Sequence, residues 1–142
     1  MYFIGIDISK FKHDCSVIDD FGEIVTPSWS FTNDSEGFAQ LKILLDSLDA
    51  ETRIGLESTG HYGMNLKLYL ESNNFSFMEF NPLLINRFVK SKSLRKTKND
   101  SIDCMMIARY LMTVEYKPYP PLLYTLEKLK SVTRFRDSLV RQ

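Results

Sequence analysis

Residues 2–8, Tyr2-Phe3-Ile4-Gly5-Ile6-Asp7-Ile8, carry the strongest structural signal in the chain. The run is rich in β-branched and aromatic side chains, which predicts a buried strand near the centre of a sheet. Asp7 stands inside this run, where an ionised carboxylate without a partner is costly to bury. We therefore expect Asp7 to bind a cation, or alternatively to contact a phosphate or a ribose.

The segments that follow predict an α/β fold. The expected strands alternate with turn residues, Asp19-Asp20-Phe21-Gly22 among them, and cover residues 2–8, 13–19, about 23–31, 53–57 and 75–80. The expected helices carry apolar side chains at helical spacing and begin within Asn33–Glu36, near residue 61, at Asn81-Pro82 and at residue 99. A three-stranded meander that leads into βαβαβ crossovers gives a mixed five-stranded sheet flanked by helices. This is the pattern of the ribonuclease H-like (RuvC-like) fold.

The composition indicates a soluble globular protein. The chain has 142 residues, 44% of them hydrophobic and 25% charged, which suits one domain with a core and excludes a disordered chain. No apolar run approaches the roughly 18 residues of a membrane span, and the N-terminus does not resemble a signal peptide. Cys15 and Cys104 stand apart, which predicts reduced packing residues. We expect a cytoplasmic protein without membrane contact.

The net charge of zero conceals a strong asymmetry. Residues 1–86 carry 5 basic and 13 acidic residues, whereas residues 99–142 carry 7 basic and 5 acidic ones. Between them lies a segment without acids, and its six basic residues are Arg87, Lys90, Lys92, Arg95, Lys96 and Lys98. A basic stretch next to a carboxylate-rich body suits binding of nucleic-acid phosphates. The alternative is a solvated loop.

Four acidic residues can form a metal site. Asp7 and Glu57 lie on strands that can be neighbours, and Asp100 and Asp103 are three residues apart on an expected helix, hence on one face. Converging carboxylates repel one another unless a cation lies between them, and oxygen ligands suit Mg²⁺ or Mn²⁺. Two such ions can stabilise the attacking and the leaving oxygen of a phosphoryl transfer.

Each acid also has a simpler explanation. Asp100 and Glu57 can be surface residues, and Asp100 can cap the helix that follows it. Asp103 can pair with Lys96 or Lys98. His61, which can assist proton transfer, and Tyr62 and Trp29, which can stack on bases, have packing as their default role.

The C-terminal part predicts a further helix. Residues 117–121, Lys-Pro-Tyr-Pro-Pro, form a stiff break, and apolar residues three or four apart continue to the last residue without a helix stop signal. We expect a fragment that ends inside a helix. The alternative is a complete helix that binds a partner.

Four blocks of sequence together resemble one family. They are Gly5-Ile6-Asp7-Ile8-Ser9-Lys10, Glu57-Ser58-Thr59-Gly60-His61-Tyr62, Asn81-Pro82 and the segment from Lys96 to Asp103. Their order resembles that of the DEDD transposases of insertion sequences, which are related to the Piv-type site-specific DNA invertases. The resemblance runs from residue 3 to about residue 113. Asn99 and Ser101 depart from it, which leaves the start of the local helix open.

The resemblance implies a role for each part of the chain. Residues 1–116 would form a RuvC-like catalytic domain with Asp7, Glu57, Asp100 and Asp103 as its acidic residues, Mg²⁺ as cofactor and DNA as substrate. Residues 117–142 would begin a helical, coiled-coil-like segment that leads to a C-terminal transposase domain outside this chain, which supplies a serine nucleophile. The family also implies a structured guide RNA and a homo-oligomer, for which we expect contacts through the C-terminal helix.

Two other functions remain open at this point. One is a non-catalytic module that binds nucleic acid through residues 87–98 and dimerises through residues 122–142. The other is a fragment of an actin-like or sugar-kinase-type ATPase, whose phosphate loop also reads Gly-Ile-Asp. The short chain and the lack of a second Gly-rich loop count against the ATPase, and the absence of a thermal shift with ATP would exclude it.

Overall fold

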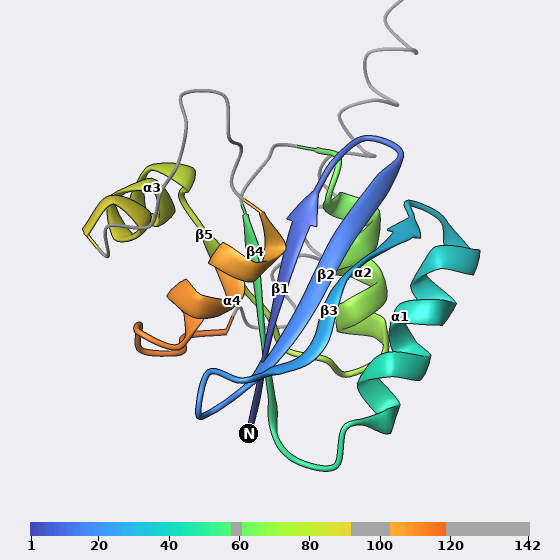
Figure 1. The fold of residues 1–142 in the computed structure, drawn as a ribbon. Coiled ribbons are helices and arrows are strands. Elements are labelled where there is room, and N and C mark those ends of the chain that lie inside the picture. Colours follow the sequence, from blue (N-terminus) through green and yellow to red (C-terminus); the bar gives the residue numbers. More distant parts are fainter. Residues whose placement is uncertain (58–60, 92–102, 119–142) are drawn as a thin grey trace, which may run out of the picture.

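The computed structural model describes residues 1–57, 61–91 and 103–118, and it shows a mixed five-stranded sheet (Figure 1). The strands are β1 (Tyr2–Ile8), β2 (Lys12–Asp19), β3 (Ile24–Thr32), β4 (Thr52–Glu57) and β5 (Met78–Phe80). Their order in the sheet is β3-β2-β1-β4-β5. β2 is antiparallel to β1 and β3, whereas β4 runs parallel to both β1 and β5. The predicted ribonuclease H-like sheet is thus confirmed, with β1 at its centre.

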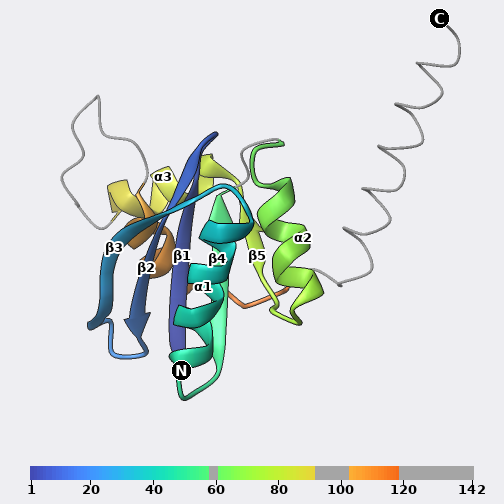
Figure 2. The same ribbon diagram turned by 90° about the vertical axis from the view of Figure 1, so that its right-hand side faces the viewer.

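Helices cover both faces of the sheet. Among the described residues they are α1 (Ser35–Ser47), α2 (Met64–Ser72), α3 (Pro82–Ser91) and α4 (Cys104–Leu111). Figure 2 shows α1 and α2 on one side of the sheet and α3 and α4 on the other. Each side has its own apolar core, because alternate strand residues point to opposite faces. None of the helices described is long and apolar enough to cross a membrane.

The ends of the elements follow from local chemistry. The carboxylate of Asp19 accepts hydrogen bonds from the amides of Phe21 and Glu23, and Gly22 adopts a φ of +81° in the predicted hairpin turn. Asp34 caps α1 by accepting from the amide of Gly37 at 2.9 Å.

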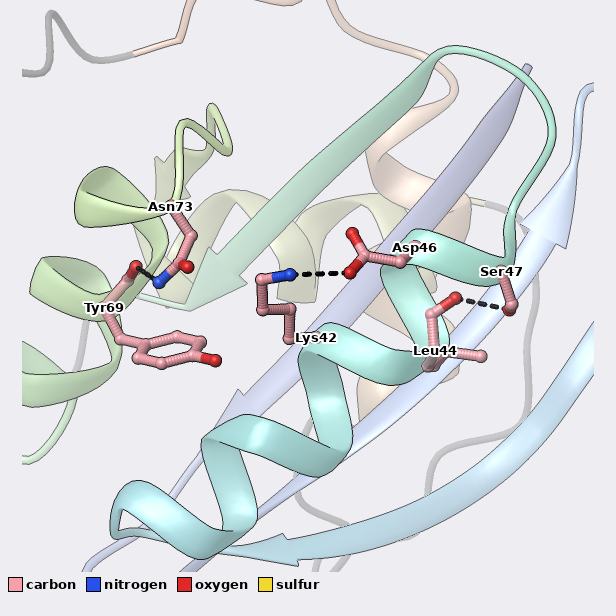
Figure 3. A network of polar contacts seen from close by, with 6 residues as sticks. All are labelled: Lys42, Leu44, Asp46, Ser47, Tyr69 and Asn73. Atoms are coloured by element: carbon pink, nitrogen blue, oxygen red, sulfur yellow. Dashed lines mark hydrogen bonds and ion pairs between the residues drawn. The ribbon is translucent and has the colours of Figure 1, made fainter.

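The outer surfaces of α1 and α2 carry ordinary helix-stabilising contacts (Figure 3). Lys42 and Asp46 form an ion pair of 2.7 Å one helical turn apart on α1, with the Lys42 amine directed at the Asp46 carboxylate. At the end of α2 the Asn73 amide donates to the carbonyl of Tyr69.

Three elements differ from their predicted extent. The fifth strand covers only Met78–Phe80, because the amide of Phe75 donates to the carbonyl of Leu70 at the end of α2 and Phe77 packs into the core. The helix expected from residue 61 begins at Met64. The helix expected over residues 99–113 is described as Cys104–Leu111, and residues 99–102 lie outside the described part. The predicted C-terminal helix, residues 122–142, also lies outside it.

Candidate functional site

Gly5 lets α4 lie directly on the central strand. Ile4, Ile6 and Ile8 of β1 belong to the core on the α1 and α2 side, so Gly5 and Asp7 face α4. A Cβ atom on Gly5 would lie 2.1 Å from the carbonyl oxygen of Cys104. The absence of a side chain at Gly5 therefore permits the N-terminus of α4 to approach the strand two residues before Asp7.

The thiol of Cys104, in the first turn of α4, contacts two strands of the sheet. The Cys104 sulfur lies 2.8 Å from the hydroxyl of Ser16 on β2 and 3.3 Å from that of Ser28 on β3. Cys15 and Cys104 are both free and buried, as the sequence predicts. These contacts fix the residue before Cys104, which is Asp103, over the sheet.

Asp7 has an acidic neighbour on each side. On β2 its antiparallel partner is Asp14. On β4 the parallel register pairs Ile6 with Leu56, and one further residue along both strands places Glu57 beside Asp7. The prediction that the strands of Asp7 and Glu57 are neighbours is confirmed.

Asp103 reaches this end of the sheet from α4, though not as the sequence suggests. It is the N-cap of α4, with extended backbone angles (φ −102°, ψ 169°), and its carboxylate accepts from the amide of Met106 at 2.8 Å. The expectation that Asp103 lies on a helix face with Asp100 is therefore wrong for Asp103, because a capping residue precedes the helix. Asp100 lies outside the described residues.

Asp103 has a structural role as the N-cap of α4, and a substitution can test this role separately from the charge of the carboxylate. Asn caps helices about as well as Asp does, whereas Ala costs about 1 kcal/mol. We expect Asp103→Ala to lower the free energy of unfolding by about 1 kcal/mol, and Asp103→Asn to change it by much less. Urea unfolding monitored by circular dichroism measures both values. Equal losses in the two variants would show that the cap does not account for the effect.

The convergence of these acids alters the protonation of Asp7. The pKa of Asp7 is raised from 3.8 to about 6, most strongly by burial and then by the charges of Glu57, Asp14 and Asp103 in that order. Each of the three acids is thus near enough to disfavour a negative charge on Asp7. A cation between the carboxylates would remove this repulsion.

Asp14 is the acidic neighbour that the sequence analysis missed. Its carboxylate also accepts from the hydroxyl of Ser30 on β3, its partner across the sheet. The signal was present, since Asp7 and Asp14 lie at equal distances from the turn at Lys10-Phe11. Pairing the two predicted strands about that turn would have placed the two acids opposite each other.

The donor chemistry of this site suits a hard divalent cation. Asp7, Asp14, Glu57 and Asp103 offer only carboxylate oxygens, the ligands that Mg²⁺ and Mn²⁺ prefer. Within the described ranges 1–57, 61–91 and 103–118, no three His, Cys, Asp or Glu side chains are placed closely enough to hold an ion. The type of ligand atom therefore suits the cation, although the described side chains stand too far apart to enclose one.

Two of the six predicted phosphate-binding residues lie within the described residues. Arg87 and Lys90 are exposed on α3, which contacts α4 on the same side of the sheet. The other four lie outside the described part of the chain: Lys92, Arg95, Lys96 and Lys98.

Comparisons with known proteins agree with the motifs. A family model described as a transposase, of the DEDD type, matches residues 4–142. The pilin gene-inverting protein of Moraxella bovis is 32% identical over 123 residues, which cover 84% of this chain and 36% of that protein. The pilin gene-inverting protein of Moraxella lacunata is also 32% identical, over 124 residues that cover the same shares. The chain thus spans about a third of the length of these curated relatives. On this match and on the fold around Asp7, the chain belongs to the DEDD transposase family.

Proposed function

We propose that this chain is the metal-binding catalytic domain of a DNA transposase or site-specific recombinase, with Asp7, Glu57, Asp100 and Asp103 as its acidic residues. The observation that carries the proposal is the convergence of Asp7, Glu57 and Asp103: after burial, the charges of Glu57 and Asp103 contribute to the raised pKa of Asp7. Like charges that lie near a half-buried carboxylate are unfavourable unless the site binds a cation.

The described residues contribute rigid positions for the ligands. Asp7 and Glu57 stand on adjacent parallel strands, and Asp103 is held by the amide of Met106. When bound, Mg²⁺ or Mn²⁺ stabilises negative charge on the attacking and the leaving oxygen of a phosphodiester. The chain's own part is to hold carboxylates on one side of that phosphate and to orient it. Arg87, Lys90 and the rest of the basic segment attract the neighbouring phosphates.

The greater length of the relatives and the family support a proposal for the wider organisation of the protein. We propose that residues 1–116 form the RuvC-like domain and that residues 117–142 begin a helical segment leading to a C-terminal domain with a serine nucleophile. The partners we propose are DNA, a structured guide RNA and further copies of the protein. Inversion of a gene, which the names of the two Moraxella proteins describe, is one outcome of this chemistry.

Glu57→Gln in the full-length protein tests the proposal. The substitution keeps the size of the side chain and removes its charge, so we expect strand cleavage to fall by about 10²–10³-fold while DNA binding is retained. Glu51→Gln is the matched control, because Glu51 is exposed just before the opposite end of β4. A gel-based cleavage assay with Mg²⁺ measures both variants. Cleavage by Glu57→Gln at the rate of the control would refute the proposed role of Glu57.

A binding module without chemistry is the second candidate, and the exposed Arg87 and Lys90 favour it. The two functions differ in their need for a cation. If nucleic-acid binding is the whole function, the DNA will remain uncleaved both in Mg²⁺ and in EDTA. Glu57→Gln will then leave every measured property unchanged.

A further inference from the structure

Two exposed turns at one end of the sheet carry aromatic rings. The turn between β1 and β2 presents Phe11, whose side chain is 76% exposed. The segment between β4 and α2 presents His61 and Tyr62, both exposed, with ring centroids 4.6 Å apart. Exposed aromatic rings suit stacking against a flat partner.

Asn33 joins the two turns. Its side-chain nitrogen donates to the carbonyl oxygens of Lys10 (3.0 Å) and Tyr62 (3.2 Å), and its backbone amide donates to the carbonyl oxygen of Phe11 (2.9 Å). Figure 1 shows the turn after β1 and the start of α2 at the same end of the molecule. The Phe11 and Tyr62 backbones are therefore held side by side.

The buried residue His13 holds the β1–β2 turn in place through a hydrogen bond. His13 is fully buried, its ring is stacked parallel to that of Phe38, and its Nδ1 atom accepts from the amide of Ser9 at 3.2 Å. The turn that carries Phe11 is thus preorganised although Phe11 itself makes little contact with the core.

Two lysines beside the rings offer positive charge to an anionic partner. The Nζ atom of Lys10 lies 5.1 Å from the centre of the Phe11 ring, and Lys12 is exposed one residue further on. The carboxylate of Asp34, which follows Asn33, is engaged by the hydroxyl of Thr32 and the amide of Gly37. Rings flanked by cations are the usual composition of surfaces that bind single-stranded nucleic acid.

We propose that Phe11, His61 and Tyr62 form a stacking surface for an unpaired nucleobase. The inference rests on the proposed function, because Phe11 follows Asp7 by four residues and Tyr62 follows Glu57 by five, at the end of the sheet where the carboxylates meet. A nucleic-acid strand whose phosphodiester lies at the carboxylates passes this end of the sheet. Stacking holds the strand without selecting its sequence, since every base has a flat face.

Fluorescence of 2-aminopurine in short oligonucleotides tests the surface directly, because stacking on a ring quenches this base. The chain is titrated in EDTA with a single-stranded DNA, a single-stranded RNA and a duplex DNA that each contain the probe. Phe11→Leu and Tyr62→Leu remove the rings but keep apolar volume, and Phe11→Trp restores a ring. Phe21→Leu is the matched control, since Phe21 is 86% exposed in the β2–β3 turn at the opposite end of the sheet.

We expect the two Leu variants to weaken single-strand binding by about tenfold each, and Phe11→Trp and Phe21→Leu to bind as the unchanged chain does. A loss confined to DNA or to RNA identifies the strand that stacks. Unchanged binding by both Leu variants overturns the proposal, and so does an equal loss in Phe21→Leu or in duplex binding. Since EDTA removes divalent cations, this result is independent of the cleavage test with Glu57→Gln. Each hypothesis can therefore fail alone.

Discussion

Asp7→Asn is expected to make the metal-free chain more stable while it removes DNA cleavage by the full-length protein. The pKa of Asp7 is raised to about 6, chiefly by burial and then by Glu57, Asp14 and Asp103. The difference from 3.8 corresponds to about 3 kcal/mol, which water reduces to about 1–2 kcal/mol because the side chain is only half-buried. Asn has a similar size and cannot ionise, so it avoids this cost.

The stabilisation by Asp7→Asn has a defined pH dependence. A carboxyl group whose pKa is higher in the folded than in the unfolded chain binds more protons when folded, so its contribution to stability falls as pH rises. We expect the advantage of Asp7→Asn to be small at pH 4, to grow between about pH 4 and pH 6, and to stay constant above. Urea unfolding of both chains in EDTA across this range measures it. An advantage that shrinks as pH rises would contradict the raised pKa of Asp7.

Although Asp7→Asn should raise stability, it should lower the rate of DNA cleavage. Loss of one group that stabilises the transition state typically lowers the rate by about 10²–10³-fold, and loss of a shared metal ligand should do at least that. Asp20→Asn is the matched control, because Asp20 is exposed in the turn after β2, at the far end of the sheet. Full recombination by Asp7→Asn would exclude a catalytic role for this residue.

Gly5→Ala is expected to destabilise the chain by about 3 kcal/mol or more, because overpacking against backbone leaves no side chain that can move aside. The added Cβ would lie 2.1 Å from the Cys104 carbonyl oxygen and 2.5 Å from the Ala108 nitrogen, so α4 itself must shift. Such a shift carries Asp103 away from Asp7. We therefore expect loss of activity together with loss of stability.

Gly55→Ala provides the comparison for Gly5→Ala. Gly55 is the partner of Gly5 on β4, and a Cβ there would meet the Phe80 ring at 2.8 Å and the Leu111 side chain at 3.3 Å. Side chains can yield more easily than the backbone of α4 can. In thermal unfolding we expect a much lower melting temperature for Gly5→Ala than for Gly55→Ala. The reverse order would show that the approach of α4 to β1 is not the decisive contact.

The sequence predicted most of the sheet because its signals are local. The apolar run around Asp7, the turn at Asp19–Gly22 and the helix start within Asn33–Glu36 each depend on residues near in sequence, and all three are confirmed. The neighbourhood of Asp7 and Glu57 followed from the order of the strands, and it is also confirmed.

The parts that were missed depend on contacts between distant residues. Asp103 reads as a helical residue until the position of α4 shows that its side chain caps the helix instead. Asp14 gains its importance only from its register with Asp7, and the stacking surface only from Asn33, which joins two turns. Sequence periodicity reports which face a residue occupies, not what lies opposite to it.

Paramagnetic broadening by Mn²⁺ tests the central claim most directly, because it locates even a weakly bound ion. The isotopically labelled chain is titrated with substoichiometric Mn²⁺ while its amide resonances are recorded. The proposed site predicts that the amides of Asp7, Glu57 and Cys104 broaden first, whereas those near Gly22 at the far end of the sheet remain sharp. Broadening centred away from Asp7 and Glu57, or spread evenly over the acidic surface, would contradict the assignment of these carboxylates to a metal site.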